Sequence, residues 1–268
     1  MHASGACDSG CKSQCPDKYM PYLFEIPSHK FLAGVKVLTG ISDKKILAFS
    51  PHSDDLSIGA GGFLAHLSKT NNIKPVLAYT GWRGVKDNNP VAGAIKTREK
   101  EMEQETHILG IKEPIFLHLL TYENDNKEDR KKDAIKIKEV IRREKPDIIF
   151  LPNEKDIHPR HKLLSFLILS VLKELEISIE LFFYEIPWSV FSGEEFNFVV
   201  PLSNKLVSKK INAIKVHKSQ LARTNFVRLS KALLSLRAGM VPEQKIAGYG
   251  ESVSLGNWVE VYKHKLLK

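Results

Sequence analysis

Cysteine is almost absent from this chain, which has three in 268 residues, all near its start: Cys7, Cys11 and Cys15. The rest of the sequence needs no disulfides to fold, and a reducing, cytoplasmic setting fits best. The even spacing of the thiols matches no metal motif with a known mechanism, and a fourth ligand is missing. We therefore expect a flexible, polar leader over residues 1–20 without the apolar stretch of a signal peptide.

Long hydrophobic runs are also lacking. The longest candidate, Leu163–Leu172, contains serines and is shorter than the roughly 18 apolar residues that a membrane helix needs. Hydrophobic residues are 43% and charged residues 26% of the chain, which are ordinary values for a globular protein. A membrane span, a wholly disordered chain and a collagen-like chain are thereby excluded. We expect one domain over residues 21–268, since a single core can serve this length.

Aromatic residues do not alternate with the basic ones. The net charge is +9, but the lysines lie in mixed segments such as Asn124–Lys145, where glutamates accompany them. Single-stranded nucleic acid is bound by basic residues together with stacking aromatics. We interpret the positive charge as a solvated surface and expect no nucleic-acid partner.

Short apolar runs alternate with helix-like segments along the body of the chain. Such alternation predicts an α/β fold with a Rossmann-like, mostly parallel sheet flanked by helices in a single domain. The expected strands are Ile46–Phe49, Pro75–Tyr79, Ile115–Leu117, Ile148–Leu151, Leu181–Tyr184, Val199–Leu202 and Trp258–Tyr262. The expected helices are Ile58–Lys69, Ala92–Leu109, Asp129–Lys145, Leu163–Leu175, Ser203–His217 and Asn225–Ala238.

Polar residues follow two of these strands, at the edge where α/β sheets bind their ligands. His52 and Asp55 come after the first strand, and His161 comes after the fourth. Two imidazoles and one carboxylate suit a catalytic zinc ion that keeps one position open for water, although another divalent metal is also compatible. Asp54, beside Asp55, is the candidate general base. His158 precedes His161 by one helical turn and is the candidate for stabilising an oxyanion or protonating a leaving amine.

Simpler interpretations exist for each feature. Asp54 or Asp55 could cap the following helix, and paired histidines three residues apart are common on surfaces. Trp82 and Arg83 follow the second strand and could contact a sugar and an anionic group, but Trp82 could equally pack beneath its loop. The glycines of Gly59–Gly62 lack the Lys-Ser/Thr of a phosphate loop, so close helix–sheet packing explains them better.

The motifs resemble those of a known family. Ser50–Asp55 followed by Ile58–Gly62 is similar to the A-H-P-D-D-x-x-x-G-x-G-G signature of the zinc-dependent N-acetylglucosaminyl deacetylases, the PIG-L/LmbE-like family, and His158–His161 resembles its H-P-D-H. Weaker similarities lie in Arg98–Glu101, Lys215–Gln220 and Tyr249–Ser252, so the resemblance spans about residues 44–255. The layout is nearest to the diacetylchitobiose deacetylase-like branch.

The resemblance implies a role for each matching residue. His52, Asp55 and His161 match zinc ligands, Asp54 the base, His158 the acid or oxyanion-stabilising histidine, and Arg98 a substrate-contacting arginine. Some positions depart from the family pattern, namely Ser53, Ser57, Arg160 and Val253. Arg160 replaces the aspartate of H-P-D-H, and we expect its positive charge to lower the pKa of His158.

These observations predict a metal-dependent amidohydrolase that removes an acetyl group from an N-acetylglucosamine-type sugar or glycoconjugate. A sugar-binding member of the fold with altered catalysis is one alternative, and a metal-dependent hydrolase of another amide is a second. Because symmetric assemblies are common, a homo-oligomer is compatible with the sequence, although no interface is readable from it.

Overall fold

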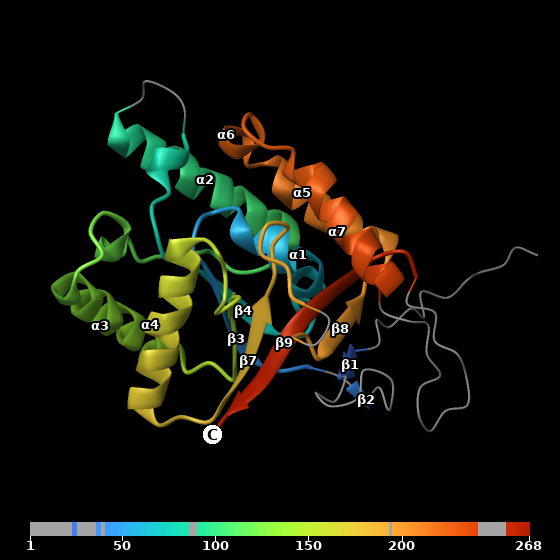
Figure 1. The fold of residues 1–268 in the computed structure, drawn as a ribbon, viewed down its shortest axis with the longest axis horizontal. Helices are drawn as coiled ribbons and strands as arrows, with labels where there is room; N and C mark the ends of the chain where they lie inside the picture. Colours follow the sequence, from blue (N-terminus) through green and yellow to red (C-terminus); the bar gives the residue numbers. More distant parts are fainter. Residues whose placement is uncertain (1–22, 26–35, 39–40, 86–89, 193–194, 241–255) are drawn as a thin grey trace, which may run out of the picture.

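The computed structural model describes residues 23–25, 36–38, 41–85, 90–192, 195–240 and 256–268. The predictions for the leader over residues 1–20 with its three cysteines, for Tyr249–Ser252 and for Val253 lie outside these residues. One sheet runs through the middle of the molecule with helices on both faces, which confirms the predicted α/β class (Figure 1).

Within the described residues the sheet has nine strands, in the order β2-β1-β8-β9-β7-β6-β3-β4-β5. The five strands from β7 to β5 are parallel, as predicted. The structure adds an antiparallel half, because β9 runs opposite to both β7 and β8, and β1 pairs antiparallel with β8 and β2. The strands are β1 (Leu23–Glu25), β2 (Lys36–Leu38), β3 (Lys45–Ser50), β4 (Asn72–Leu77), β5 (Ile115–Phe116), β6 (Ile148–Pro152), β7 (Ile179–Tyr184), β8 (Phe198–Pro201) and β9 (Val259–Leu267).

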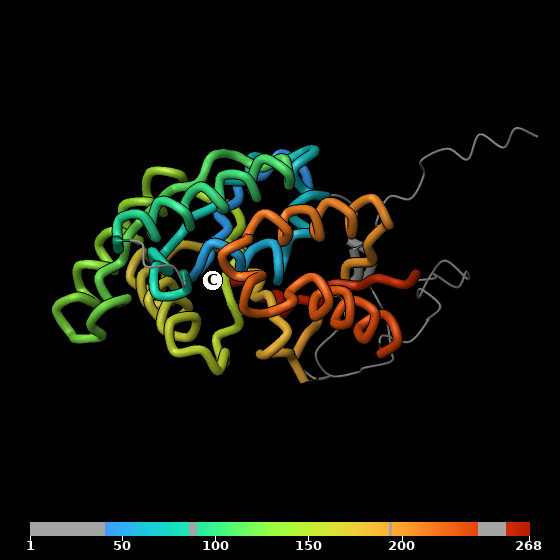
Figure 2. The backbone as a smooth tube through the Cα atoms, turned by 90° about the horizontal axis from the view of Figure 1, so that it is seen from above, coloured from blue at the N-terminus to red at the C-terminus, as the bar shows by residue number. Residues whose placement is uncertain are grey.

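The helices divide between the two faces of the sheet. Apolar side chains of α3 and α4 pack with one set of strand residues, and those of α1, α2, α5 and α7 pack with the alternate set. Seen from above, α5 and α7 lie side by side at the end of the molecule opposite α3 (Figure 2). The helices are α1 (Asp55–Leu67), α2 (Val91–Leu109), α3 (Lys127–Glu144), α4 (Pro159–Leu175), α5 (Asn204–Lys215), α6 (Lys218–Leu221) and α7 (Phe226–Met240).

The glycines of α1 serve close packing against the sheet, in agreement with the interpretation made from the sequence. A Cβ at Gly59 would lie 2.3 Å from Cδ2 of Tyr184, and one at Gly62 would lie 2.4 Å from Cδ1 of Leu202. A side chain at either position would therefore push the helix off the sheet.

The chain order creates a switch point beside β3. From β3 the chain moves outward through β4 and β5, and then returns to place β6 on the other side of β3. The loops after β3 and β6 therefore leave the sheet in opposite directions, at the kind of position where open α/β sheets bind their ligands. Four helices begin earlier than the sequence predicted, with the largest differences at α1, which starts at Asp55, and at α4, which starts at Pro159. Proline lies in the first turn of α4, where it is favoured.

The described part of the chain holds no helix of the length and apolar character that crossing a membrane requires.

Candidate active site

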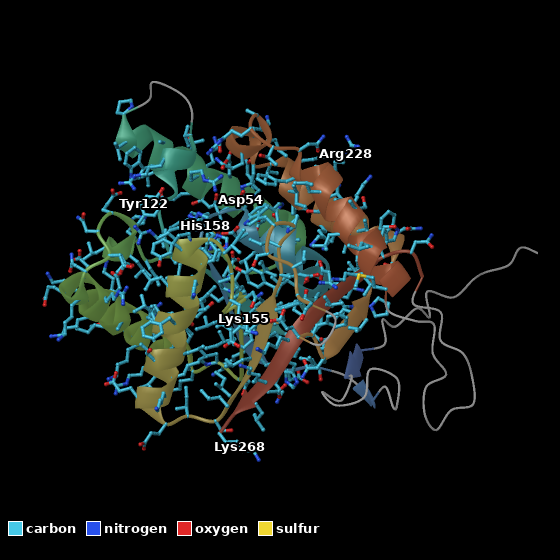
Figure 3. The ribbon with its side chains drawn as sticks, viewed as in Figure 1. Asp54, Tyr122, Lys155, His158, Arg228 and Lys268 are labelled. Carbon is cyan, nitrogen blue, oxygen red and sulfur yellow. The ribbon has the colours of Figure 1, made fainter. Side chains whose placement is uncertain are left out.

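The switch point beside β3 gathers the polar residues that the sequence singled out. His52 and Asp55 arrive at the end of β3 and the start of α1, while His158 and His161 arrive at the start of α4, after β6. Figure 3 shows Asp54 and His158 close to each other where the parallel strands end. Residues more than 100 positions apart thus meet because β3 and β6 are parallel neighbours with matched ends.

The three predicted ligands form a nearly equilateral triangle. Nδ1 of His52, Oδ2 of Asp55 and Nε2 of His161 are each 3.2 Å from the other two. A tetrahedral zinc ion with bonds near 2.0–2.1 Å sets its ligand atoms roughly 3.3 Å apart. The donor set and its spacing therefore fit a zinc ion with one position left for another ligand.

A second carboxylate orients His161. Oδ2 of Asp156 lies 2.9 Å from Nδ1 of His161, and both side chains are buried. This bond turns Nε2 of His161 toward Asp55, which is how carboxylates commonly support a ligating histidine. Burial opposes charge on His161, but Asp55 and Asp156 raise its pKa to about 10. Burial likewise opposes charge on Asp55, yet His161 and His52 hold its pKa well below the usual range.

His158 stands beside the triangle. Its ring centroid lies 5.1 Å from that of His52 and 4.5 Å from that of His161. One nitrogen from each of these three histidines lies within 4.8 Å of the others, so His158 is near enough to serve as a further ligand or as a hydrogen-bond donor. Its Nδ1 is buried, and none of the described residues forms a hydrogen bond with it.

The pKa of His158 is lowered to about 4, as the sequence led us to expect, but the cause is different. Burial is the largest contribution, followed by the charges of His161 and His52. We expected the lowering to come from Arg160. The histidine cluster itself accounts for it, because three imidazoles share a desolvated space.

Asp54 does not use its carboxylate to cap α1, although it occupies the N-cap position. Its Oδ1 instead accepts a hydrogen bond of 2.6 Å from Nη2 of Arg98, which is only 2% exposed. Within the described ranges no group donates to Oδ2 of Asp54. The structure thus places Arg98 against the candidate base, and its predicted contact with substrate stays a prediction.

The turn Trp82–Gly84 follows β4, the strand next to β3 in the sheet. Nε1 of Trp82 and Nη2 of Arg83 donate to the two oxygens of Glu123, at 2.7 and 2.6 Å. The Arg83 guanidinium carbon lies 5.5 Å from the ring centre of Tyr122, whose ring centre is 6.4 Å from that of His52. The predicted substrate residues are therefore connected to the metal-type site through Tyr122.

The sequence alone assigned no individual role to three residues near the site, namely Tyr122, Glu123 and His217. The first two follow a short strand in a loop without periodicity, so no local pattern marks them. His217 lies in the Lys215–Gln220 segment, which we singled out only as a family resemblance. It is fully buried against Glu105, with 2.6 Å between Nε2 and Oε2.

Fold and site together define a class: an α/β protein with a His/Asp metal-type centre at a switch point of its sheet. Residues 47–172 match the model of the PIG-L family, described as GlcNAc-PI de-N-acetylase. Over 129 residues the chain is 30% identical to the diacetylchitobiose deacetylase of Thermococcus kodakarensis. The aligned segment covers 46% of this chain and 47% of that protein. The similarity to this family therefore covers residues 47–172, a segment that includes His52, Asp55, His158 and His161.

Solved structures share the fold along most of the chain. The N,N'-diacetylchitobiose deacetylase of Pyrococcus horikoshii superposes with a TM-score of 0.64 at 22% identity, covering 83% of this chain and 84% of that one. GalB, the 4-carboxy-2-hydroxymuconate hydratase of Pseudomonas putida, superposes with a TM-score of 0.63 at 17% identity, covering 84% and 97%. The fold therefore accommodates more than one reaction, and the site must decide the chemistry. The alignment with the Thermococcus kodakarensis protein spans about half of its length.

Proposed function

We propose that this chain is a zinc-dependent hydrolase that removes an N-acetyl group from an N-acetylglucosamine-type sugar derivative. The triangle formed by His52, Asp55 and His161 carries this proposal, since all three ligand atoms lie 3.2 Å from one another. The family match over residues 47–172 supports the amide of an amino sugar as the bond that is cleaved.

The chain's own residues then have separate tasks. Zinc held by His52, Asp55 and His161 would supply Lewis-acid chemistry, which polarises a carbonyl and makes water more acidic. Asp54 accepts a proton from the attacking water at Oδ2, because Oδ1 is occupied by Arg98. His158 faces the same space and donates a hydrogen bond to the oxygen on which negative charge develops. The proton taken up by Asp54 passes to the leaving nitrogen as the C–N bond breaks, so that the amine and acetate are the products.

Acetate release from zinc-loaded protein tests the proposal. The substrates are free N-acetylglucosamine, short chitin oligomers, and phosphorylated, nucleotide-linked and thiol-conjugated forms. We expect release from one of them that stops with a chelator and returns with zinc, and a metal panel shows whether another divalent ion substitutes. Binding of a glycan without release would indicate a sugar-binding member, and release only from other amides would indicate a different substrate class.

Asp54→Asn tests the assignment of the base. We expect turnover to fall by roughly 100- to 10,000-fold, since the amide cannot accept the proton, while zinc stays bound in stoichiometric amount. Acetate release and metal content are measured on the same sample. Asp43→Asn is the matched control, because Asp43 is exposed and precedes β3 at its other end. Near-normal turnover of Asp54→Asn would remove Asp54 as the base.

A further inference from the structure

The short helix α6 and the residue before it contact two separate parts of the site. His217 anchors this segment on α2 through Glu105, with 2.6 Å between Nε2 of His217 and Oε2 of Glu105. Both side chains are fully buried, which holds the segment in one place relative to α2. Ser219 and Gln220 follow after Lys218; Nε2 of Gln220 donates to Oγ of Ser219 at 3.1 Å, and each side chain also bonds a neighbour of its own.

Ser219 connects to the candidate base. Its backbone N–H and its Oγ donate to the two oxygens of Glu101, at 2.8 and 2.7 Å. Oε2 of Glu101 lies 3.4 Å from Nη1 of Arg98, and Nη2 of the same guanidinium lies 2.6 Å from Asp54. Arg98 therefore stands between two carboxylates. Ser219 donates a hydrogen bond to each oxygen of Glu101 and so fixes this carboxylate. Glu101 therefore does not compete with Asp54 for the Arg98 guanidinium.

Gln220 connects to the turn Trp82–Gly84. Its Nε2 donates to the carbonyl oxygen of Gly84 at 3.1 Å. A Cβ at Gly84 would lie 3.0 Å from that nitrogen, so the amide lies directly on the turn. At the other end of the turn, Gly81 has a φ of +64°, and a Cβ there would lie 3.3 Å from Nε of Arg98. The turn that carries Trp82 is thus held between Arg98 and Gln220.

We propose that Ser219 and Gln220 are positioning residues with separable tasks. Ser219 fixes the Asp54 carboxylate through Glu101 and Arg98, and so supports the chemical step. Gln220 fixes the Trp82–Gly84 turn, and so supports substrate binding. The kinetic effects of these two residues rest on the proposed function. Their positions rest on the contacts described above.

Steady-state kinetics of two variants tests the separation. Ser219→Ala is expected to lower kcat by on the order of 10- to 100-fold with KM within about twofold, because a displaced base costs rate rather than affinity. Gln220→Ala is expected to raise KM by roughly three- to tenfold with kcat within about twofold, the effect of one lost hydrogen bond. Ser219→Thr keeps the hydroxyl and should recover most of kcat. Gln220→Glu keeps the size but loses the donor, and should behave like Gln220→Ala.

Ser170→Ala and Gln104→Ala are the matched controls, since both side chains are exposed on α4 and α2. Zinc content is measured for every variant, and it should not change. If both variants shift kcat and KM in the same proportion, or if neither parameter moves, the separation is wrong.

A measurement without turnover distinguishes this proposal from the proposed function. The chain has three tryptophans, so Trp188→Phe and Trp258→Phe together leave the emission of Trp82 alone. In that background Gln220→Ala should increase acrylamide quenching by about twofold, whereas Ser219→Ala should not. A crystal structure of Ser219→Ala should show Arg98 withdrawn from Asp54. Unchanged quenching would overturn the task assigned to Gln220, and an intact Arg98–Asp54 bond would overturn the task assigned to Ser219. Both results can be obtained without a known substrate.

Discussion

At the scale of the residue, the site depends on side chains that hold other side chains. Asp156 accepts a hydrogen bond from the backbone of His158 at 2.8 Å through Oδ1 and contacts His161 through Oδ2. One carboxylate thereby sets the direction of a predicted ligand and the position of its neighbour.

Asp156→Asn should weaken zinc binding by about 10- to 100-fold, because an amide supports the ligating histidine less well than a carboxylate. Competition with a chromophoric chelator measures the affinity, and circular dichroism checks that the fold is intact. Asp43→Asn serves again as the control. Equal affinities of Asp156→Asn and the parent chain would show that His161 is oriented by packing alone.

At the scale of the element, α1 positions the site by lying directly on the sheet. Its first residue is the predicted ligand Asp55, and its glycines allow contact with β7 and the residue after it. The helix therefore cannot shift without moving Asp55 relative to His161. The packing of α1 on the sheet thus constrains the geometry of the predicted metal site.

Gly59→Ala should destabilise the fold by about 1–3 kcal/mol, since the added carbon would lie 2.3 Å from Tyr184 and 2.9 Å from the carbonyl oxygen of Glu185. Urea unfolding followed by circular dichroism gives the free energy of unfolding. The control is Gly239→Ala in α7, where a Cβ meets nothing within 4 Å and alanine should be neutral or stabilising. A decrease in the free energy of unfolding no larger than that of the control would mean that α1 can shift on the sheet without cost.

At the scale of the whole molecule, buried charges join the helices of one face to each other and to the sheet. Lys210 of α5 contacts Glu260 of β9 at 2.7 Å, and Glu260 also accepts from the backbone N–H groups of Gly62 and Phe63 in α1. His217 forms the corresponding connection to α2. Burial opposes its charge, but its contacts with Glu101 at 3.8 Å and Glu105 at 2.6 Å, together with the nearby charges of Glu105 and Asp54, raise its pKa to about 9.

This raised pKa predicts a loss of stability at alkaline pH. The charge of His217 stabilises the fold fully below about pH 6.5, the ordinary histidine value, and its contribution disappears as the pH rises toward 9. The difference in unfolding free energy between the parent chain and His217→Gln should therefore shrink between pH 6.5 and 9, by on the order of 1–3 kcal/mol. Urea unfolding at several pH values measures it, with His107→Gln as the control. A pH-independent difference would contradict a charged His217.

The sequence by itself determined the elements and the kinds of side chain that follow them. Apolar runs and helix periodicity reflect local burial, so strands such as Ile46–Phe49 and the helix ending at Leu109 could be predicted with small errors at their ends. The placement of polar residues after the first and fourth strands also followed, because parallel strands end at one edge. His52, Asp55 and His161 could be named as a group for this reason.

Only the tertiary structure decided which atoms meet. The 3.2 Å triangle requires β6 to return beside β3, a pairing between segments about 100 residues apart that no local pattern encodes. The insertion of β9 between β7 and β8, the contact of Arg98 with Asp54, and the support from Ser219 and Gln220 arise in the same way. Local periodicity records whether a side chain is buried, whereas its partner is chosen by the packing of the whole chain.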